Sequence, residues 1–409
     1  MMQHRMTTPG PLLDGQGRLM EKGFATSLIR TYNRDAIAAS RLRIKEWDYY
    51  CVCMDRFALA LTIDDNGYMT MDSISLLLFD ENAQTTSSRI SLPMFSKRTF
   101  PATSERGDVR AAGKDYELAF ENDGTCRRLH GYMKGFQKDK EISFDLKLTD
   151  APEETMVIAT PFRDKPKAFY YNQKINCLRT EGTIRLGGRE FTCDPAKDFA
   201  VLDWGRGVWT YDNTWYWGSA SGLAEGVPFG FNIGYGFGDT SAATENVLVY
   251  GGKIHKLSQV KFEIPVKDGR DDFMSPWKFT SDDGRFEMDF RPVMDRSALI
   301  NLGVICSDQH QVFGRFSGTA VTDDGQKIVI SDLMGFAEKV RNKWYDEDRR
   351  SPGRRKGYPG RKKDCCPVQM CHTGRPGNET VSPGRIPGYL PAGSSGLCRS
   401  LPGWKSGLR

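Results

Sequence analysis

DWGRGVWTY at residues 203–211, WYWG at 215–218 and FGFNIGYGFG at 229–238 are the stretches that indicate the fold. In the last of them large side chains alternate with glycine or asparagine, the period of two that predicts a β-strand. A strand with a glycine face is weak on its own, so another group is expected to lie close against it. That group is either a ligand or tryptophan rings, since four of the chain's eight tryptophans lie between residues 204 and 217.

The same alternation recurs along the chain, for example at residues 142–148, 260–264 and 286–290. Asp-Gly and Gly-Gly pairs separate such segments, and glycine supplies the positive φ that tight turns need. Only residues 33–40 suggest a helix, of two turns with Asn33 as its cap. The sequence therefore predicts an all-β protein, built from antiparallel barrels or sandwiches.

The length of 409 residues predicts two domains, with a boundary in the proline-bearing stretch between them. We expect one β-domain over residues 12–160 and a second, carrying the tryptophan-rich segment, over residues 166–345. Residues 349–409 hold 11 glycines and 8 prolines and carry a net charge of +11. This composition predicts a disordered basic tail. The tail could serve as a basic arm for nucleic acid or anionic lipid, or as a Cys/His tract that binds a metal. The favoured alternative is a disordered, out-of-frame extension without a role.

The composition also argues against several function classes. Residues 1–348 carry a net charge of −6, so no basic patch for nucleic acid is expected. No apolar run is long enough for a membrane span, and the N-terminus lacks a signal-peptide pattern, so the cytoplasm is the expected compartment. The common metal-protease, serine-hydrolase and nucleotide-binding motifs are absent, and the sequence predicts neither a metal site nor a cofactor. The oligomeric state stays open.

Asp203 and Arg206 are the charged residues of the aromatic segment before Asp212, and an extended chain points them to opposite faces. A buried carboxyl needs a partner, for which Arg206, Lys45 and Arg179 are the candidates. An acid in an apolar pocket has a raised pKa and can donate a proton. Asp203 is therefore the candidate general acid, with Arg206 as its modulator. The alternative is a structural carboxylate that accepts backbone N–H groups.

Other candidates surround this pair. Glu245 follows the glycine strand in a loop, where a capped turn is the alternative, and His255 is either an acid/base group or a solvated strand start. Residues 45–48 (KEWD) precede the first confident strand, and their charges pair across the sheet, line a mouth or, as the favoured alternative, form a solvated face. The candidate ligand-binding residues are Trp204, Trp209, Trp215, Trp217, Phe231, Tyr235, Glu245 and His255.

Five segments carry a resemblance to a known family. They are IKEWDYY at 44–50, DWGRGVW at 203–209, WYWG at 215–218, EN at 245–246 and GFAE at 335–338. On these the chain resembles the bacterial family of domain of unknown function 2804, from about Leu12 to Trp344. The family implies no activity, and the predicted tail lies outside the match.

A second, distant resemblance rests on the order of YY at 170–171, TEGTI at 180–184, GGR at 187–189 and DWG at 203–205. This order is similar to that in lipocalin-like carotenoid hydratases. The resemblance implies two lipocalin-like β-barrels in tandem, isoprenoid or other lipid-like substrates, and a proton donor at Asp203. This chain departs from the pattern by placing Trp204 directly after the acid, with Arg206 and Gly207 following.

Three functions are compatible with these observations. The leading hypothesis is a pocket for a hydrophobic small molecule, isoprenoid or acyl, lined by the aromatic segment. The second is a lyase- or hydratase-like enzyme that uses Asp203 as general acid. The third is a structural or interaction protein in which the aromatic residues serve packing alone.

Overall fold

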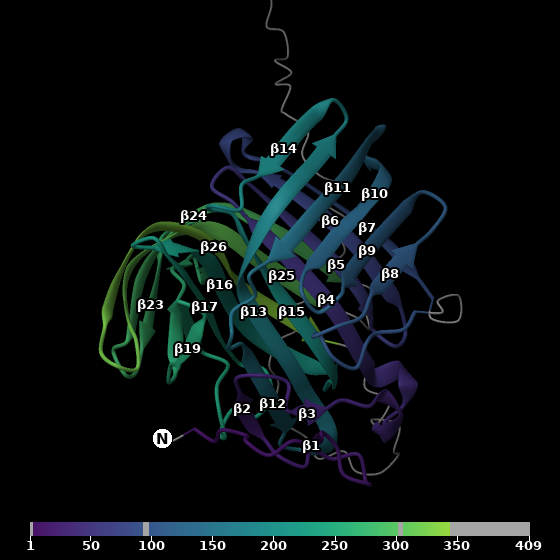
Figure 1. Ribbon diagram of the computed structural model, residues 1–409, viewed down its shortest axis with the longest axis vertical. Helices are drawn as coiled ribbons and strands as arrows, with labels where there is room; N and C mark the ends of the chain where they lie inside the picture. Colours follow the sequence, from purple (N-terminus) through teal and green to yellow (C-terminus); the bar gives the residue numbers. More distant parts are fainter. Residues whose placement is uncertain (1–2, 93–97, 302–305, 344–409) are drawn as a thin grey trace, which may run out of the picture. The chain divides into compact units, whose positions relative to one another are not determined.

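A computed structural model describes residues 3–92, 98–301 and 306–343. They fall within one compact unit, and the predicted tail, residues 349–409, lies outside the described residues. Two curled antiparallel sheets follow one another along the described chain, which confirms the all-β prediction. The strands of each sheet are separated by short turns (Figure 1).

The first sheet is formed by the N-terminal part of the chain, and its path runs β7-β6-β5-β4-β15-β13-β11-β10-β9-β8. Strands β2, β12 and β14 are attached to it, the last two through β13. The bounds are β2 Gly23–Ala25, β4 Ile44–Cys53, β5 Phe57–Asp65, β6 Thr70–Leu78, β7 Ala83–Ser91, β8 Val109–Ala112, β9 Tyr116–Asn122, β10 Arg127–Gln137, β11 Lys140–Thr149, β12 Met156–Phe162, β13 Lys165–Leu186, β14 Arg189–Cys193 and β15 Phe199–Val208.

The second sheet follows in the order β19-β18-β17-β16-β26-β25-β24-β23-β20. Its bounds are β16 Asp212–Ala224, β17 Val227–Tyr235, β18 Val247–Tyr250, β19 Lys253–Lys256, β20 Val260–Glu263, β23 Trp277–Ser281, β24 Phe286–Asn301, β25 Cys306–Val321 and β26 Lys327–Lys343. Two small two-stranded sheets pair β1 Gly10–Pro11 with β3 Arg30–Thr31, and β21 Val266–Lys267 with β22 Arg270–Asp271.

The first sheet curls far enough to bring distant strands together. The side chain of Gln137 on β10 donates a hydrogen bond to Thr85 on β7 (3.1 Å), and Arg89 of β7 pairs with Asp115 (2.8 Å). Apolar side chains fill the inside of this curl, among them Leu61, which is fully buried. The sheet therefore closes over its own core, as the alternation of apolar and polar residues requires.

Two details differ from the expectations. Residues 33–40 form only a short 3₁₀ turn, Arg34–Ala36, although Asn33 caps it as predicted by accepting from the N–H of Asp35 (2.9 Å). The turn buries no side chain, and so short a helix is not stable without packing. The sheets change over between Val208 and Asp212 rather than near residue 160, while the division into domains at 12–160 and 166–345 stays a prediction.

The outer face of the first sheet packs against the second sheet. A separate buried cluster joins the two, to which Cys51, Val201, Phe313 and Phe336 all belong. A bulge in β13 adds a polar link, because the side-chain amide of Asn176 donates to the hydroxyl of Ser219 (2.8 Å) and to the carbonyl of Phe231 (3.0 Å). This junction holds the tryptophan-rich segment between two sheets.

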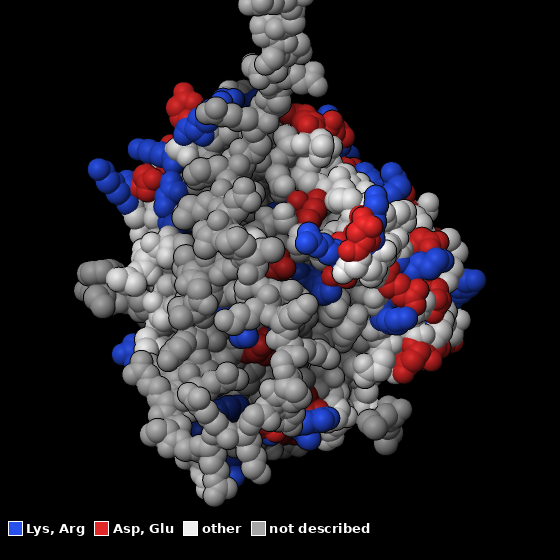
Figure 2. All heavy atoms as spheres, turned by 180° about the vertical axis from the view of Figure 1, so that it is seen from behind, with Lys and Arg blue, Asp and Glu red and all other residues white. Residues whose placement is uncertain are grey.

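The surface seen from behind carries charges of both signs. In Figure 2 basic and acidic side chains lie next to each other over the right-hand side of the described surface. Exposed cross-strand pairs of the first sheet include Arg128 with Asp145 (2.7 Å). Among the described residues, the structure has no helix with the length and hydropathy needed to cross a bilayer.

We predict that Gly205→Ala destabilises the fold. Trp47 lies opposite Gly205 in the register of β4 and β15, and a Cβ at Gly205 would lie 1.9 Å from Cζ2 of its indole. We expect the free energy of unfolding to fall by about 1–3 kcal/mol, measured by urea denaturation, because overpacking displaces the ring. Gly188→Ala is the control, since nothing lies within 4 Å of its Cβ position. Equal stability of the two variants would contradict the prediction.

Candidate functional site

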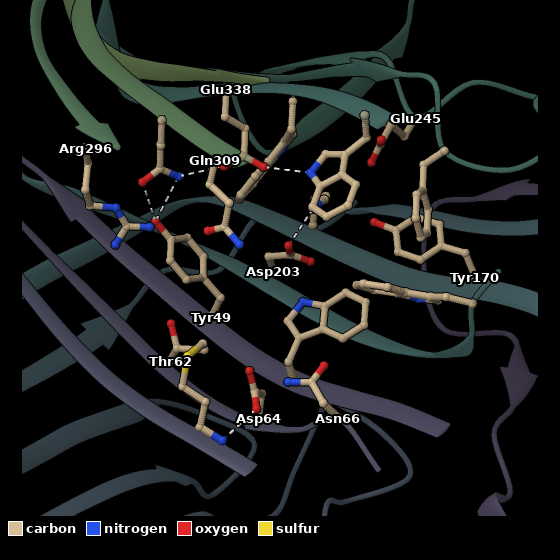
Figure 3. A pocket seen from close by; sticks show the side chains of 18 residues that line it. Tyr49, Thr62, Asp64, Asn66, Tyr170, Asp203, Glu245, Arg296, Gln309 and Glu338 are labelled. Carbon is tan, nitrogen blue, oxygen red and sulfur yellow. Dashed lines mark hydrogen bonds and ion pairs between the residues drawn. The ribbon is translucent and has the colours of Figure 1, made fainter. Parts of the chain in front are cut away.

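A cavity of about 220 Å³ lies at the junction of the two sheets. Strands of both sheets contribute to its wall, and Figure 3 shows Asp203 near its middle, with Glu338 and Gln309 on one side and Asp64 and Asn66 on the other. The residues that line it are Trp47, Tyr49, Thr62, Asp64, Asn66, Met71, Tyr170, Lys174, Asp203, Trp209, Trp215, Trp217, Phe237, Glu245, Arg296, Gln309, Gln311 and Glu338.

Aromatic rings set at steep angles to one another form one wall. Trp209 lies edge-to-face against Trp47 (centroids 5.2 Å apart), Trp215 (5.9 Å) and Phe237 (4.9 Å). Tyr170 stacks parallel to Trp47 (6.2 Å) and edge-on to Phe237 (5.0 Å). Since rings in this arrangement fix one another's orientation, the wall is preformed rather than assembled around a ligand.

A buried ion pair crosses the cavity wall. Lys174 and Asp203 are directly opposite each other on β13 and β15, and the ammonium lies 2.8 Å from the carboxylate. The same ammonium lies 3.8 Å from the ring centroid of Trp217, and the side-chain amide of Asn172 donates to the second oxygen of Asp203 (2.5 Å). Both donors suit an ionised carboxylate at Asp203.

Glu338 is the centre of a hydrogen-bonded group on the other side. One of its oxygens accepts from the indole N–H of Trp215 (2.9 Å) and the other from the side-chain amide of Gln311 (3.1 Å). Gln311 in turn hydrogen-bonds the hydroxyl of Tyr49 (3.2 Å). Burial is the main cause that raises the pKa of Glu338 to about 7, and the Lys174 and Arg296 charges oppose it only in part.

Two further carboxyls face the cavity. Burial raises the pKa of Asp64 to about 7, against the hydrogen bond from the N–H of Met71 (2.8 Å). Burial also raises the pKa of Glu245, which accepts a long hydrogen bond from Asn232 (3.4 Å). With Asp203 and Glu338, four carboxyls line the cavity against two basic side chains, Lys174 and Arg296. The cavity thus has apolar walls and a surplus of acids.

The structure brings five of the ten predicted site residues together at this cavity, namely Asp203, Trp209, Trp215, Trp217 and Glu245. They come from β15, its C-terminal end, β16 and the loop after β17. The glycine face of β17 is approached by side chains of the protein. A Cβ at Gly234 would lie 2.7 Å from a Glu245 oxygen, and one at Gly230 would lie 2.8 Å from the sulfur of Cys177. The roles of the five predicted residues in binding or catalysis stay predictions.

The other five predicted residues do not line this cavity. Trp204 and Arg206 are fully buried on the opposite face of β15, where the guanidinium contacts Asp48 (3.0 Å) and lies over the Trp204 ring. Phe231 belongs to the core of the second sheet, and Tyr235 stacks on Tyr216 there. The fifth of these residues, His255, lies on β19, and its ring nitrogen accepts a hydrogen bond from the N–H of Asp323 (3.1 Å).

Two sequence expectations about this region are wrong. The partner of Asp203 is Lys174, whereas Arg206 lies on the other face of the same strand. The KEWD segment at 45–48 is not a solvated face, since Lys45, Glu46 and Asp48 are buried and Trp47 lines the cavity. Charged residues were expected outside because burying them is costly, but here each has a partner, such as Glu46 with the hydroxyl of Tyr32 (2.8 Å).

Sequence reasoning missed several cavity residues. Lys174, Asp64 and Arg296 lie in strands with no local feature that distinguishes them from other strand residues, whereas Tyr170 belongs to the YY pair at 170–171. Glu338 had one signal, its place in the GFAE segment at 335–338. Within the described ranges, no three His, Cys, Asp or Glu side chains are grouped to hold a metal ion, and the six cysteines there are free thiols.

Residues 3–344 match the family described as Domain of unknown function (DUF2804). The chain belongs to this family. The match confirms the resemblance found in the sequence and covers both sheets. No curated protein matches the sequence.

Several solved structures share part of the chain path. A protein from Nitrosomonas europaea proposed to be AttH is 15% identical, covers 77% of this chain and 98% of its own, and superposes with a TM-score of 0.47. Kievitone hydratase from Nectria haematococca is 12% identical (77% and 96% covered, TM-score 0.43). CghA with Sch210972 is 11% identical (82% and 98% covered, TM-score 0.42). At these scores no function passes from them to this chain.

We predict that Lys174 and Asp203 are strongly coupled. Lys174→Met and Asp203→Asn should each lower the free energy of unfolding by roughly 3 kcal/mol, because each leaves a buried charge without its partner. The double variant should lose much less than the two single losses together. Urea denaturation of all four proteins measures the coupling, and additive losses would contradict a buried ion pair.

We also predict that Glu338 makes stability depend on pH. Its pKa is about 7 in the folded protein and 4.5 in the unfolded chain, so the folded state keeps the proton up to a higher pH than the unfolded state does. The free energy of unfolding should therefore fall as pH rises from about 4.5 to 7, by at most about 1.4 kcal/mol per pH unit for this group. Glu338→Gln should flatten this fall, as measured by denaturation at several pH values. An unchanged pH profile would argue against it.

Proposed function

We propose that this protein binds a small, largely apolar molecule in the cavity between its two sheets, with an isoprenoid or acyl skeleton as the favoured class. The observation that carries the proposal is the preformed aromatic wall of Trp47, Trp209, Trp215, Phe237 and Tyr170 along one side of a partly open cavity. A concave site that combines aromatic side chains with polar groups that fix orientation is typical of ligand sites.

The volume of the cavity restricts the class of ligand that it can hold. Its volume of about 220 Å³ is below the range of about 300–1,000 Å³ that is usual for pockets of drug-sized ligands. A long polyene does not fit such a space, whereas a short terpenoid or a short acyl chain does. The polar groups at the cavity wall, such as Gln309 and Arg296, supply hydrogen bonds for one polar substituent.

A second candidate is an enzyme that moves a proton in this cavity, as a lyase or hydratase does. The observation in its favour is Glu338, whose pKa of about 7 lets it hold or release a proton near neutrality. Asp203, the acid expected from the sequence, is less suited to donate because Lys174 lies 2.8 Å away. Loss of turnover in Glu338→Gln with binding intact would support this candidate, and loss in Asp203→Asn alone would return the role to Asp203.

We predict saturable quenching of tryptophan fluorescence by short lipophilic ligands, tested with geraniol and methyl hexanoate, because four tryptophans line the cavity. Gln309→Phe should abolish it by filling the space, and extraction of the purified protein would identify a ligand that co-purifies.

Gln326→Phe, at an exposed position outside the cavity lining, is the matched control and should quench like the unmodified protein. No response to any ligand, in a protein shown to be folded, would leave the aromatic segment with a packing role alone. Equal quenching of all three proteins would place binding elsewhere.

A further inference from the structure

We infer that the ligand of this cavity carries a compact alkylammonium group, seated against the rings of the aromatic wall and beside Glu245. The inference rests on the proposed ligand-binding function and adds the chemical class of the recognised group. It follows from three observations, which are the arrangement of the rings, the surplus of carboxyls and the way the cavity already holds one cation.

The arrangement of the rings is that of an aromatic cage. The planes of Trp47, Trp215 and Phe237 make angles of 76°, 67° and 79° with the plane of Trp209. Rings set nearly at right angles enclose a corner in which a group meets π faces from more than one direction. Such corners attract quaternary and alkylated ammonium groups, because the ring faces carry partial negative charge.

The carboxyls of the cavity indicate that the ligand is positively charged. Lys174 is paired with Asp203, which leaves Asp64, Glu245 and Glu338 facing the cavity with Arg296 as the remaining basic side chain of the lining. In Figure 3 Arg296 lies at one end of the cavity, while Glu245 and Tyr170 lie at the other. The aromatic end therefore combines a carboxyl with ring faces and lies away from the guanidinium.

Glu245 is the carboxyl best placed to meet a cation. Within the described residues its carboxyl accepts one hydrogen bond, the 3.4 Å contact from Asn232, and its other oxygen lies against Gly234. Asn232 is itself held, since it accepts from the indole N–H of Trp217 (2.7 Å). Glu245 is half-buried and accepts few hydrogen bonds, and the charges of Lys174 and Lys256 reach its carboxyl without a direct ion pair to it. A cationic ligand in contact with this carboxyl would add the pairing that it lacks.

Lys174 shows that the cavity stabilises an ammonium group. Its nitrogen sits on the face of Trp217 with a carboxylate at hydrogen-bond distance, and its side chain is 3% exposed. A ligand ammonium between Glu245 and the neighbouring rings would make the same two kinds of contact. The cavity would then hold the Lys174 ammonium beside Asp203 at its middle and the ligand ammonium beside Glu245 at its aromatic end, with Arg296 at the other end.

Two probes that differ only in charge test the inference. They are (2-hydroxyethyl)trimethylammonium and its neutral carbon analogue 3,3-dimethylbutan-1-ol, titrated against the full chain by calorimetry and tryptophan fluorescence. We expect the cation to bind at least about ten-fold more tightly than the alcohol, since ring faces and a carboxyl favour it alone. Equal affinities, or tighter binding of the alcohol, would overturn the inference.

Glu245→Gln is the decisive variant, because it removes the charge and keeps the shape. It should abolish most of the preference for the cation and leave the affinity of the alcohol unchanged, which also shows that the cavity has kept its form. Glu181→Gln is the control for overall charge, since Glu181 is exposed on β13 and pairs with Lys147 (3.1 Å). An equal loss of preference in both variants would assign it to long-range electrostatics and overturn the inference.

The outcomes separate this inference from the proposed function. If geraniol and methyl hexanoate quench the tryptophans but the protein shows no preference for the cation, the ligand is neutral and only the ammonium inference fails. If neither the apolar ligands nor the cation binds, both fail. If the cation alone binds, in a manner that depends on Glu245, the cavity is a site for organic cations and the apolar part of the proposed function is wrong.

Discussion

The ion pair between Lys174 and Asp203 is the interaction on which this site depends. It bridges adjacent strands of the first sheet at the place where the second sheet packs on them, and both partners are almost fully buried. A buried pair contributes little net stability compared with apolar packing, but removal of one partner is strongly destabilising. Its presence under the tryptophans of β16 keeps the junction polar, where an apolar junction would close by packing.

The rest of the cavity follows from that polar junction. The side-chain amide of Asn176 on β13 donates to Ser219 on β16 and to the carbonyl of Phe231 on β17, so the two sheets meet through specific contacts and leave space between them. The same desolvation that favours an apolar guest raises the pKa values of Glu338, Asp64 and Glu245. Ligand binding and proton transfer are therefore two consequences of one environment. Experiments separate them by comparing ligand affinity with turnover in variants that lack one carboxyl charge.

The period of two in the sequence was sufficient to predict an all-β fold. The residues predicted in the tryptophan-rich segment and near it supplied five of the eighteen residues that line the cavity. Alternation also placed Asp203 and Arg206 on opposite faces, as the structure has them. The partner of Asp203 was not predictable, because Lys174 meets it only through the pairing of β13 with β15. Long-range register of this kind leaves no local trace, and for the same reason Arg296 and Asp64 escaped notice.

Trp47 shows why the aromatic segment alone is an incomplete description. Its ring lies over Gly205, a position where any side chain would overlap it, so the glycine within DWG is required by a tryptophan from another part of the chain. Trp209 then packs on Trp47 and joins it to Trp215 and Phe237. The wall thus combines residues from both sheets. A change in how the sheets pack would separate these rings, and any ligand that binds between them should in turn stabilise the packing of the two sheets.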